Sequence, residues 1–419
     1  MMSIKKIMIK LQSKNFSTSI WGHLKPRPAD PILGIVEEFK KDTSPNKVNL
    51  SAGTYKDDDG KPYILNCVKA AERLIADKHL DHEYLPIDGL PSFIKNSLKL
   101  AYTPSSQALK EERIAGLQSL SGTGALKIGM EFFSQHYNGS KAVFIPNPSW
   151  PNHKNIAIKS GLDFKEYRYY DYKNKSLDLN GMLEDLDKAP NNSLVVLHVC
   201  AHNPTGMDPS ISQWKDIHKV VAKKNHFPFF DMAYQGFSSG DLDKDAYALR
   251  LFADSGVKLA LAQSYAKNFG LYGERIGCFS LICDSKQESE TALSHLKFIA
   301  RAQYSSPPKY GAHLVDIVLS DAELTNEWHR ELKVMANRIS SMRQAVYNGV
   351  YNKGSKLNWD HIVQQIGMFA FTGLNIDQVR ALKTQHHIYL TDDGRISISG
   401  LNTKNFNYVA QAFHDVTKK

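Results

Sequence analysis

Lys267 is the residue of this chain whose position says most about chemistry. It follows an apolar run and lies in a polar segment, with Ser264 three residues before it and Arg275 eight residues after it. A primary amine in such a place can form a Schiff base with a bound aldehyde, while a hydroxyl and a guanidinium beside it can bind a phosphate dianion. Most lysines are solvated surface charges, so Lys267 alone would carry little weight.

Two further apolar runs end in side chains that suit a pyridine ring. The first leads to Asn203, and the second leads to Asp231 and Tyr234. A carboxylate can keep a pyridinium nitrogen protonated, so that the ring acts as an electron sink, and an amide and a phenol can hydrogen-bond the ring's phenolic oxygen. Each feature alone is more often a turn or a helix cap. Their order, completed by Lys267 and Arg275, indicates a site for pyridoxal phosphate.

The glycine-containing turn Ser121–Gly124 has a simple physical interpretation. Lys127 stands where a dinucleotide site has its third glycine, and the turn is not a P-loop. A small turn that opens a helix at Ala125 still offers free backbone N–H groups and the positive helix end to a phosphate. Trp150 follows a polar, proline-rich turn, where an indole stacked on the pyridine ring is favoured over core packing.

At these residues the chain resembles the class I aminotransferases, and most closely their mitochondrial members that act on aspartate. The resemblance covers the chain from about Trp21 onward. Its short ordered motifs are Val48–Leu50, Gly53, His82–Pro86, Ser121–Ala125, Pro148–Trp150, Asn152–His153 and Gly394–Ser397. The resemblance implies an α/β protein of the pyridoxal-phosphate-dependent transferase fold type I. Its large domain has a mainly parallel seven-stranded sheet flanked by helices, and its second domain is a smaller α/β unit.

The resemblance also implies a role for each site residue. It implies that Lys267 is the catalytic amine, which carries the cofactor and takes the substrate's α-proton as general base. The cofactor-binding residues become Ser121, Gly122, Thr123, Trp150, His198, Asn203, Asp231, Tyr234, Ser264, Lys267 and Arg275, with Tyr84 from a neighbouring subunit. Among them His198 is expected near Asp231 as a residue that orients it. No metal is implied.

Two arginines determine the expected substrate. Arg395 resembles the family arginine that binds the α-carboxylate as a bidentate pair, and Arg301 resembles the one that reaches across a dimer to the side-chain carboxylate. Two such groups select aspartate and glutamate over monocarboxylic amino acids. Gly53, Trp150 and Asn203 complete the implied substrate-binding set.

The implied reaction is reversible transfer of an amino group between L-aspartate and 2-oxoglutarate, which gives oxaloacetate and L-glutamate by a ping-pong mechanism. The implied assembly is a homodimer with shared active sites. Two positions depart from the family pattern: Ser51 replaces a glycine, and Ser306 replaces an asparagine before Pro307. Neither is a catalytic position, so they bear on the geometry around the distal carboxylate.

Three alternatives stay open. One is the same fold specialised for aromatic or kynurenine-type substrates, against which the retained Arg301 argues. A second is another reaction of the same cofactor, such as β-elimination or decarboxylation, because a fold does not by itself define a reaction. The third is a non-catalytic basic protein that binds a membrane or a partner.

Short apolar runs separated by helix-length stretches predict the sheet that positions these groups. The runs are Ala142–Ile145, Leu194–Leu197, Phe227–Phe230, Leu259–Ala262 and Cys278–Ile282. Their spacing favours a mainly parallel sheet that is buried on both faces. The candidate residues follow such runs, so they are expected beyond the carboxyl ends of the strands, where open α/β sheets bind ligands.

The domain organisation is predicted from the two ends of the chain. Residues 323–350 form a predicted long helix whose apolar stripe leads into a second subdomain. Residues 30–39 are predicted as a capped helix with proline in its first turn, and the resemblance joins them to the C-terminal part. The predicted large domain is 63–334, and the predicted small domain combines 21–62 with 335–419.

The composition is that of an ordinary globular enzyme. Of the 419 residues, 42% are hydrophobic and 23% are charged. The net charge of +9 comes from scattered lysines without a dense basic block, which argues against nucleic acid as a partner. No apolar stretch of the sequence is long enough to span a bilayer. The four cysteines form no Cys-x-x-Cys pair, as expected of buried thiols in a reducing compartment.

The first twenty residues differ from the rest. Residues 1–20 carry four lysines and several hydroxyl side chains, and no acidic residue occurs before Asp30. Their apolar residues repeat at helical spacing, which gives a basic amphipathic face. The segment is predicted to be a cleavable mitochondrial presequence, so the enzyme is expected in the mitochondrial matrix; a disordered basic tail is the alternative.

Overall fold

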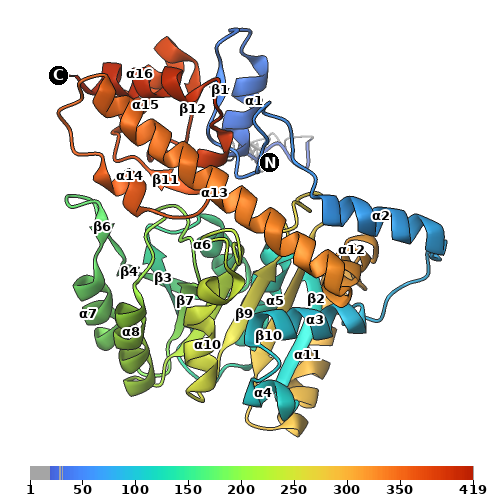
Figure 1. Ribbon diagram of the computed structural model, residues 1–419. Helices are drawn as coiled ribbons and strands as arrows, with labels where there is room; N and C mark the ends of the chain where they lie inside the picture. The colour runs from blue at the N-terminus through green and yellow to red at the C-terminus, as the bar shows by residue number, and fades with distance from the viewer. Residues whose placement is uncertain (1–18, 28–29, 31, 419) are drawn as a thin grey trace, which may run out of the picture.

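The computed structural model describes residues 19–27, 30 and 32–418, so the predicted presequence lies almost wholly outside the described residues. Figure 1 shows a larger body built on a central sheet and a smaller body that contains both the blue N-terminal segment and the orange and red C-terminal elements. Within the described ranges, no helix has the length and apolar character needed to cross a membrane.

The central sheet has seven strands in the described chain, in the order β2-β10-β9-β8-β7-β3-β4. These are β2 (Ile114–Leu120), β3 (Ala142–Asn147), β4 (Asp163–Arg168), β7 (Leu194–His198), β8 (Phe227–Met232), β9 (Ala260–Ser264) and β10 (Ile276–Ile282). Only β10 runs antiparallel to its two neighbours; the other recorded pairings are parallel. The predicted α/β fold with a mainly parallel sheet is therefore confirmed.

Helices cover both faces of this sheet, because alternate strand residues point to opposite sides. Val196 of β7 packs into one hydrophobic cluster, whereas Val195 and Leu197 pack into another on the opposite face. The helices of the larger body are α2 (Asn66–Lys78), α3 (Pro91–Tyr102), α4 (Gln107–Lys110), α5 (Ser121–His136), α6 (Asn152–Lys159), α7 (Leu179–Lys188), α8 (Ile211–Lys223), α9 (Leu242–Asp245), α10 (Tyr247–Asp254), α11 (Lys286–Tyr304) and α12 (Tyr310–Ser320). A small hairpin joins β5 (Tyr170–Asp171) to β6 (Ser176–Leu177).

The smaller body joins the two ends of the chain. Its elements are α1 (Leu33–Lys41), β1 (Val48–Asn49), α14 (Asp360–Gln364), β11 (Phe369–Phe371), α15 (Ile376–His386), β12 (Ile388–Tyr389), β13 (Arg395–Ser397), the 3-10 helix η1 (Ile398–Gly400) and α16 (Phe406–Thr417). Strand β1 pairs with β12, and β11 pairs with β13. The carboxylate of Asp30 accepts the N–H groups of Ile32 and Leu33, which caps the start of α1.

The long helix α13 (Ala322–Asn352) connects the two bodies, as Figure 1 shows. It continues without a break through the predicted boundary at residue 334, so the domain limits themselves stay a prediction. At its larger-body end, Glu331 accepts the backbone N–H groups of Asn66 and Cys67 at 2.7 and 3.0 Å, and so caps α2.

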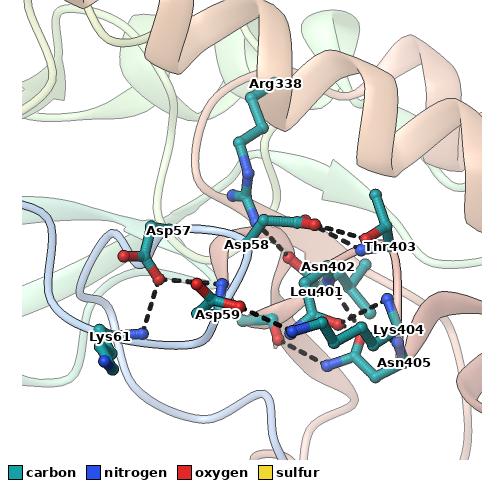
Figure 2. A network of polar contacts seen from close by, with 11 residues as sticks. Asp57, Asp58, Asp59, Lys61, Arg338, Leu401, Asn402, Thr403, Lys404 and Asn405 are labelled. Atoms are coloured by element: carbon teal, nitrogen blue, oxygen red, sulfur yellow. Dashed lines mark hydrogen bonds and ion pairs between the residues drawn. The ribbon is translucent and has the colours of Figure 1, made fainter.

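A polar network ties the N-terminal segment to the C-terminal one (Figure 2). Asp58 accepts the backbone N–H of Thr403 at 3.0 Å and pairs with Arg338 of α13 at 3.5 Å. Asp59 pairs with Lys404 at 2.6 Å. The loop that follows Gly53 is thereby held against residues 401–405 of the same body.

Candidate functional site

One cavity of about 220 Å³ lies where the parallel strands of the central sheet end. Thirteen of the predicted site residues line it: Gly53, Ser121, Gly122, Thr123, Trp150, His198, Asn203, Asp231, Tyr234, Ser264, Lys267, Arg275 and Arg395. Ile32, Leu126, Cys200, Ala233 and Phe369 complete the lining. The fold therefore brings together groups that lie up to 342 residues apart in the chain, from Gly53 to Arg395.

The reversed direction of β10 assembles one end of the cavity. Ser121 begins α5 directly after β2, Ser264 ends β9, and Arg275 directly precedes β10. Because β10 is antiparallel, its beginning lies at the edge where its two neighbours end, with Gly277 opposite Ser264. The hydroxyl oxygens of Ser121 and Ser264 are 2.9 Å apart.

These groups form a cradle that fits a phosphate. The first turn of α5 offers unpaired backbone N–H groups and the positive end of the helix dipole, and the two hydroxyls and Arg275 add further donors. Gly122 allows the close approach of α5 to β9, since a Cβ at this position would lie 3.2 Å from the Cβ of Ser264. The donor set suits a dianion.

Lys267 lies in a turn three residues after β9, with its Nζ 5.5 Å from the centre of the Tyr234 ring. Burial lowers the pKa of its amine from 10.5 to about 8; Asp231 opposes this shift, whereas Arg275 and Arg395 add to it. An amine with such a pKa is available as a nucleophile and base near neutral pH far more often than an ordinary lysine.

Asp231 lies within β8, whose end at Met232 is two residues later than the apolar run indicated. Its Oδ2 accepts a hydrogen bond from Nε2 of His153 at 2.9 Å. Burial acts to raise the pKa of this carboxyl, but the hydrogen bond from His153, with electrostatic contributions from His153, His198 and Lys267, holds it below its ordinary value. A carboxylate that stays charged is what a protonated ring nitrogen requires.

A chain of hydrogen bonds continues behind Asp231. The backbone N–H of Asn203 donates to Nδ1 of His198 at 3.3 Å, so Nε2 of His198 carries the proton and faces Ser149 Oγ at 3.3 Å. The Ser149 hydroxyl can then donate to Nδ1 of His153 at 2.9 Å, which leaves the proton of His153 on the nitrogen that faces Asp231.

The residue that orients Asp231 directly is thus His153, not His198. The family resemblance includes His153 in the motif Asn152–His153, but it assigns no hydrogen-bond partner to this residue. In the structure it comes from α6, whereas His198 is the neighbour of Asp231 across the β7–β8 ladder. His198 acts one step further away through Ser149, and burial holds the pKa of its imidazole well below the ordinary value.

Arg395 is a buried cation that also lines the cavity, 3% exposed. Its Nη1 donates to Oδ1 of Asn203 at 3.2 Å, and its Nη2 donates to the carbonyl of Ser51 at 2.9 Å. The guanidinium lies 4.2 Å from the centre of the Phe369 ring. Its buried Nε has no hydrogen-bond partner in the described part of the chain. Because the residue lines the cavity, a carboxylate that enters it can pair with this guanidinium.

Two predicted site residues lie away from the cavity. Tyr84 is 84% exposed, and Arg301 is exposed in the last turn of α11, where it bonds the Ser305 hydroxyl. Neither lines the cavity of its own chain. Their contribution from a neighbouring subunit stays a prediction.

Two other kinds of chemistry, metal binding and attack by a cysteine thiolate, have less support from the residues of this site. The described residues contain no group of three or more His, Cys, Asp or Glu side chains that could hold a metal ion. Cys200 lines the cavity, but burial raises the pKa of its thiol well above the ordinary value, so the reactive thiolate is disfavoured. All four cysteines are free and buried.

Comparisons with known proteins agree with this geometry. The family model described as aminotransferase class I and II matches residues 45–413. The mitochondrial aspartate aminotransferase of Gallus gallus is 49% identical over 402 residues, which cover 96% of this chain and 95% of that protein.

Solved structures of aminotransferases are also similar to this chain. The cytoplasmic aspartate aminotransferase of Saccharomyces cerevisiae is similar with a TM-score of 0.93 and 44% identity, covering 96% of this chain and 99% of that one. An aromatic-amino-acid aminotransferase of Burkholderia pseudomallei, covalently bound to pyridoxal phosphate, has a TM-score of 0.92 and 39% identity, covering 95% of this chain and 99% of that one.

Proposed function

The chain belongs to the class I and II aminotransferases, enzymes that depend on pyridoxal phosphate, and we propose that it transfers the amino group reversibly between L-aspartate and 2-oxoglutarate. The products are oxaloacetate and L-glutamate. One observation carries the proposal: a lysine of lowered pKa, a charged aspartate and a buried arginine with an unpaired Nε line the same cavity.

The residues of the cavity fit the cofactor in parts. Ser121, Gly122 and Thr123, with Ser264 and Arg275, would hold its phosphate. Asp231 would keep the ring nitrogen protonated, Asn203 and Tyr234 would bind the ring oxygen, and Trp150 would lie against the ring. Pyridoxal phosphate, when bound there, would supply an aldehyde group that takes up amino groups and a ring that withdraws electrons from the substrate's α-carbon.

The side chains carry out the remaining work. Arg395 binds the α-carboxylate through its guanidinium, in a buried position where this ion pair is strong. Lys267 takes the proton from the α-carbon and returns a proton in the following step; burial, which lowers the pKa of its amine, favours the neutral form that this role requires. His153 keeps Asp231 oriented and charged during both steps.

Selection of dicarboxylic substrates requires a second cation. Arg301 is the proposed partner of the side-chain carboxylate, and it is exposed in its own chain. We therefore assign it, with Tyr84, to the cavity of a second copy, so that the active enzyme is a homodimer. The names of mitochondrial relatives support a mitochondrial location, and the composition of residues 1–20 supports the matrix in particular.

The absorption spectrum of the purified protein tests the proposal. Added L-aspartate should shift the cofactor band, release oxaloacetate in a stoichiometric amount, and leave a form that 2-oxoglutarate converts back. A response to phenylalanine or kynurenine without a response to aspartate would favour the aromatic alternative. A colourless protein that gains no band with added pyridoxal phosphate would exclude an aminotransferase activity.

A further inference from the structure

Arg343 of α13 is a second buried cation, 3% exposed, and its recorded partners are backbone carbonyls. Nη1 donates to the carbonyl of Ile362 at 3.0 Å, and Nη2 donates to those of Gly367 and Phe369 at 2.7 and 2.8 Å. Burial lowers the pKa of this guanidinium to about 9, so it stays charged at neutral pH. A buried charge is costly, and no acidic side chain of the described residues contributes to this shift.

The three carbonyls belong to residues 362–369, which run from α14 to the first residue of β11. The segment turns sharply at Gly367, where φ is +77° and a Cβ would lie 2.4 Å from that of Ala201. The carbonyl of Met368 accepts the N–H of Ile398 at 2.8 Å, whereas the next carbonyl, that of Phe369, bonds Arg343. Arg343 therefore secures the side of β11 that faces away from β13.

Phe369 connects this anchor to the cavity. Its ring centre is 4.2 Å from the guanidinium carbon of Arg395, and a Cβ at Gly53 would lie 3.0 Å from its ring edge. The same strand pairing places Phe371 opposite Arg395. The ring thus bounds the space in which Arg395 can move, and a cation above an aromatic face is also attracted to it.

We infer that Arg343 is a positioning residue for substrate binding: it holds the 362–369 segment so that the Phe369 ring lies against Arg395 and keeps its guanidinium in place at the wall of the cavity. The inference rests on the proposed role of Arg395 as the group that binds the α-carboxylate. A guanidinium suits the task because its planar fork reaches Ile362 on one side and Gly367 with Phe369 on the other. An ammonium carries its three N–H donors on a single nitrogen, so it spans a shorter distance than the guanidinium fork.

Binding of succinate to the holoenzyme tests this inference without any turnover, because succinate carries two carboxylates and no amine. Calorimetry should show about tenfold weaker binding in Arg343→Met, the loss expected when one carboxylate contact is misaligned. Arg343→Lys should recover part of the affinity. In steady state, KM for aspartate should rise about tenfold in Arg343→Met while kcat falls by less than threefold.

Phe413→Leu is the matched control, because Phe413 is buried in α16 and stacks on Trp359 in the same body. It should lower Tm and leave succinate affinity unchanged. Equal weakening in Phe413→Leu and Arg343→Met would mean that Arg343 contributes stability alone, which overturns the inference. So would unchanged succinate affinity in both Arg343 variants.

A second route covers the case in which Arg343→Met does not fold. Phe369→Leu keeps an apolar side chain but removes the ring under Arg395, and it should weaken succinate binding as well. Unchanged affinity in both Phe369→Leu and Arg343→Lys overturns the inference. A wild-type protein that binds succinate but does not convert aspartate contradicts the proposed function instead, and the comparison of variants then still decides the role of Arg343.

Discussion

Replacement of Asp231 by asparagine should remove most of the catalytic power while leaving substrate binding largely intact. The Asp231 side chain is 12% exposed and lies 2.9 Å from a fully buried His153. Asparagine keeps the shape and can still accept the hydrogen bond from His153, but it has no charge to hold a proton on the ring nitrogen. Loss of one partner from a buried, hydrogen-bonded charge pair costs on the order of 2–5 kcal/mol.

At 1.4 kcal/mol for each factor of ten, this range predicts a loss of about thirtyfold to several thousandfold in kcat. KM for aspartate should change by less than fivefold, roughly 1 kcal/mol, because Arg395 and its contacts are untouched. The assay is steady-state transamination of aspartate with 2-oxoglutarate, at a cofactor concentration where the absorption spectrum shows full occupancy of each variant.

Two controls accompany this experiment. Asp231→Glu retains the charge and should recover part of kcat. His153→Gln removes the imidazole, but its amide can still donate a hydrogen bond to the carboxylate, so the loss should stay below about tenfold, less than the worth of one hydrogen bond to a charged group. A kcat of Asp231→Asn within threefold of wild type, at full occupancy, would refute the assignment of Asp231 to the ring nitrogen.

Three further predictions concern selectivity, assembly and pH. Arg301→Ala should lower kcat/KM for aspartate by about a hundredfold or more and leave kcat/KM for phenylalanine unchanged. Arg395→Ala should lower kcat/KM for both substrates, because every amino acid carries an α-carboxylate. A substrate panel in which Arg301→Ala loses equally for aspartate and phenylalanine would reject the separate roles of the two arginines. Mixed Lys267→Ala and Arg301→Ala subunits should regain aspartate activity, since one site of each hybrid has both residues intact, and no recovery after verified subunit exchange would rule out a shared site. In the cofactor-free protein, the pKa of Lys267 is about 8 in the folded state, against 10.5 for an ordinary lysine. Between these pH values the unfolded chain binds more protons than the folded one, so the stability that this buried charge costs at pH 7 is regained as the pH rises from 8 to about 10. Lys267→Met should therefore have a higher Tm than the wild type at pH 7 and a smaller advantage above pH 8, and a Tm difference that does not change with pH would contradict the burial argument.

Much of the candidate site could be predicted from the sequence, because its groups follow recognisable apolar runs. Asn203 follows β7, Asp231 lies near the end of β8, and Lys267 follows β9. The carboxyl ends of neighbouring parallel strands meet at one edge, so residue type and local pattern were sufficient to place an amine, an amide and a carboxylate together. The family motifs added Ser121 and Arg395 to the set.

The partners of these groups could not be predicted, because they depend on packing between distant segments. Asp231 is oriented by His153 from α6, although His198 is its ladder neighbour and the simpler expectation. In the sequence, Arg343 is one more charged residue of a predicted amphipathic helix. In the structure it is buried and donates hydrogen bonds to three backbone carbonyls of residues 362–369. A hydrophobic pattern indicates which residues are inside, but not which polar groups meet there.

By itself, the sequence determined five of the seven strands of the central sheet, the residue types at their ends and the family to which the chain belongs; β2 and β4, the two edge strands, were not predicted. Only the tertiary structure decided that β10 runs against its neighbours, which puts Arg275 at the beginning of a strand beside Ser264 at the end of another. An apolar run is the same in either direction, so its local pattern carries no information about orientation. Strand direction is decided by pairing and by the connections that the whole chain can make, and these exist only once the sheet has formed.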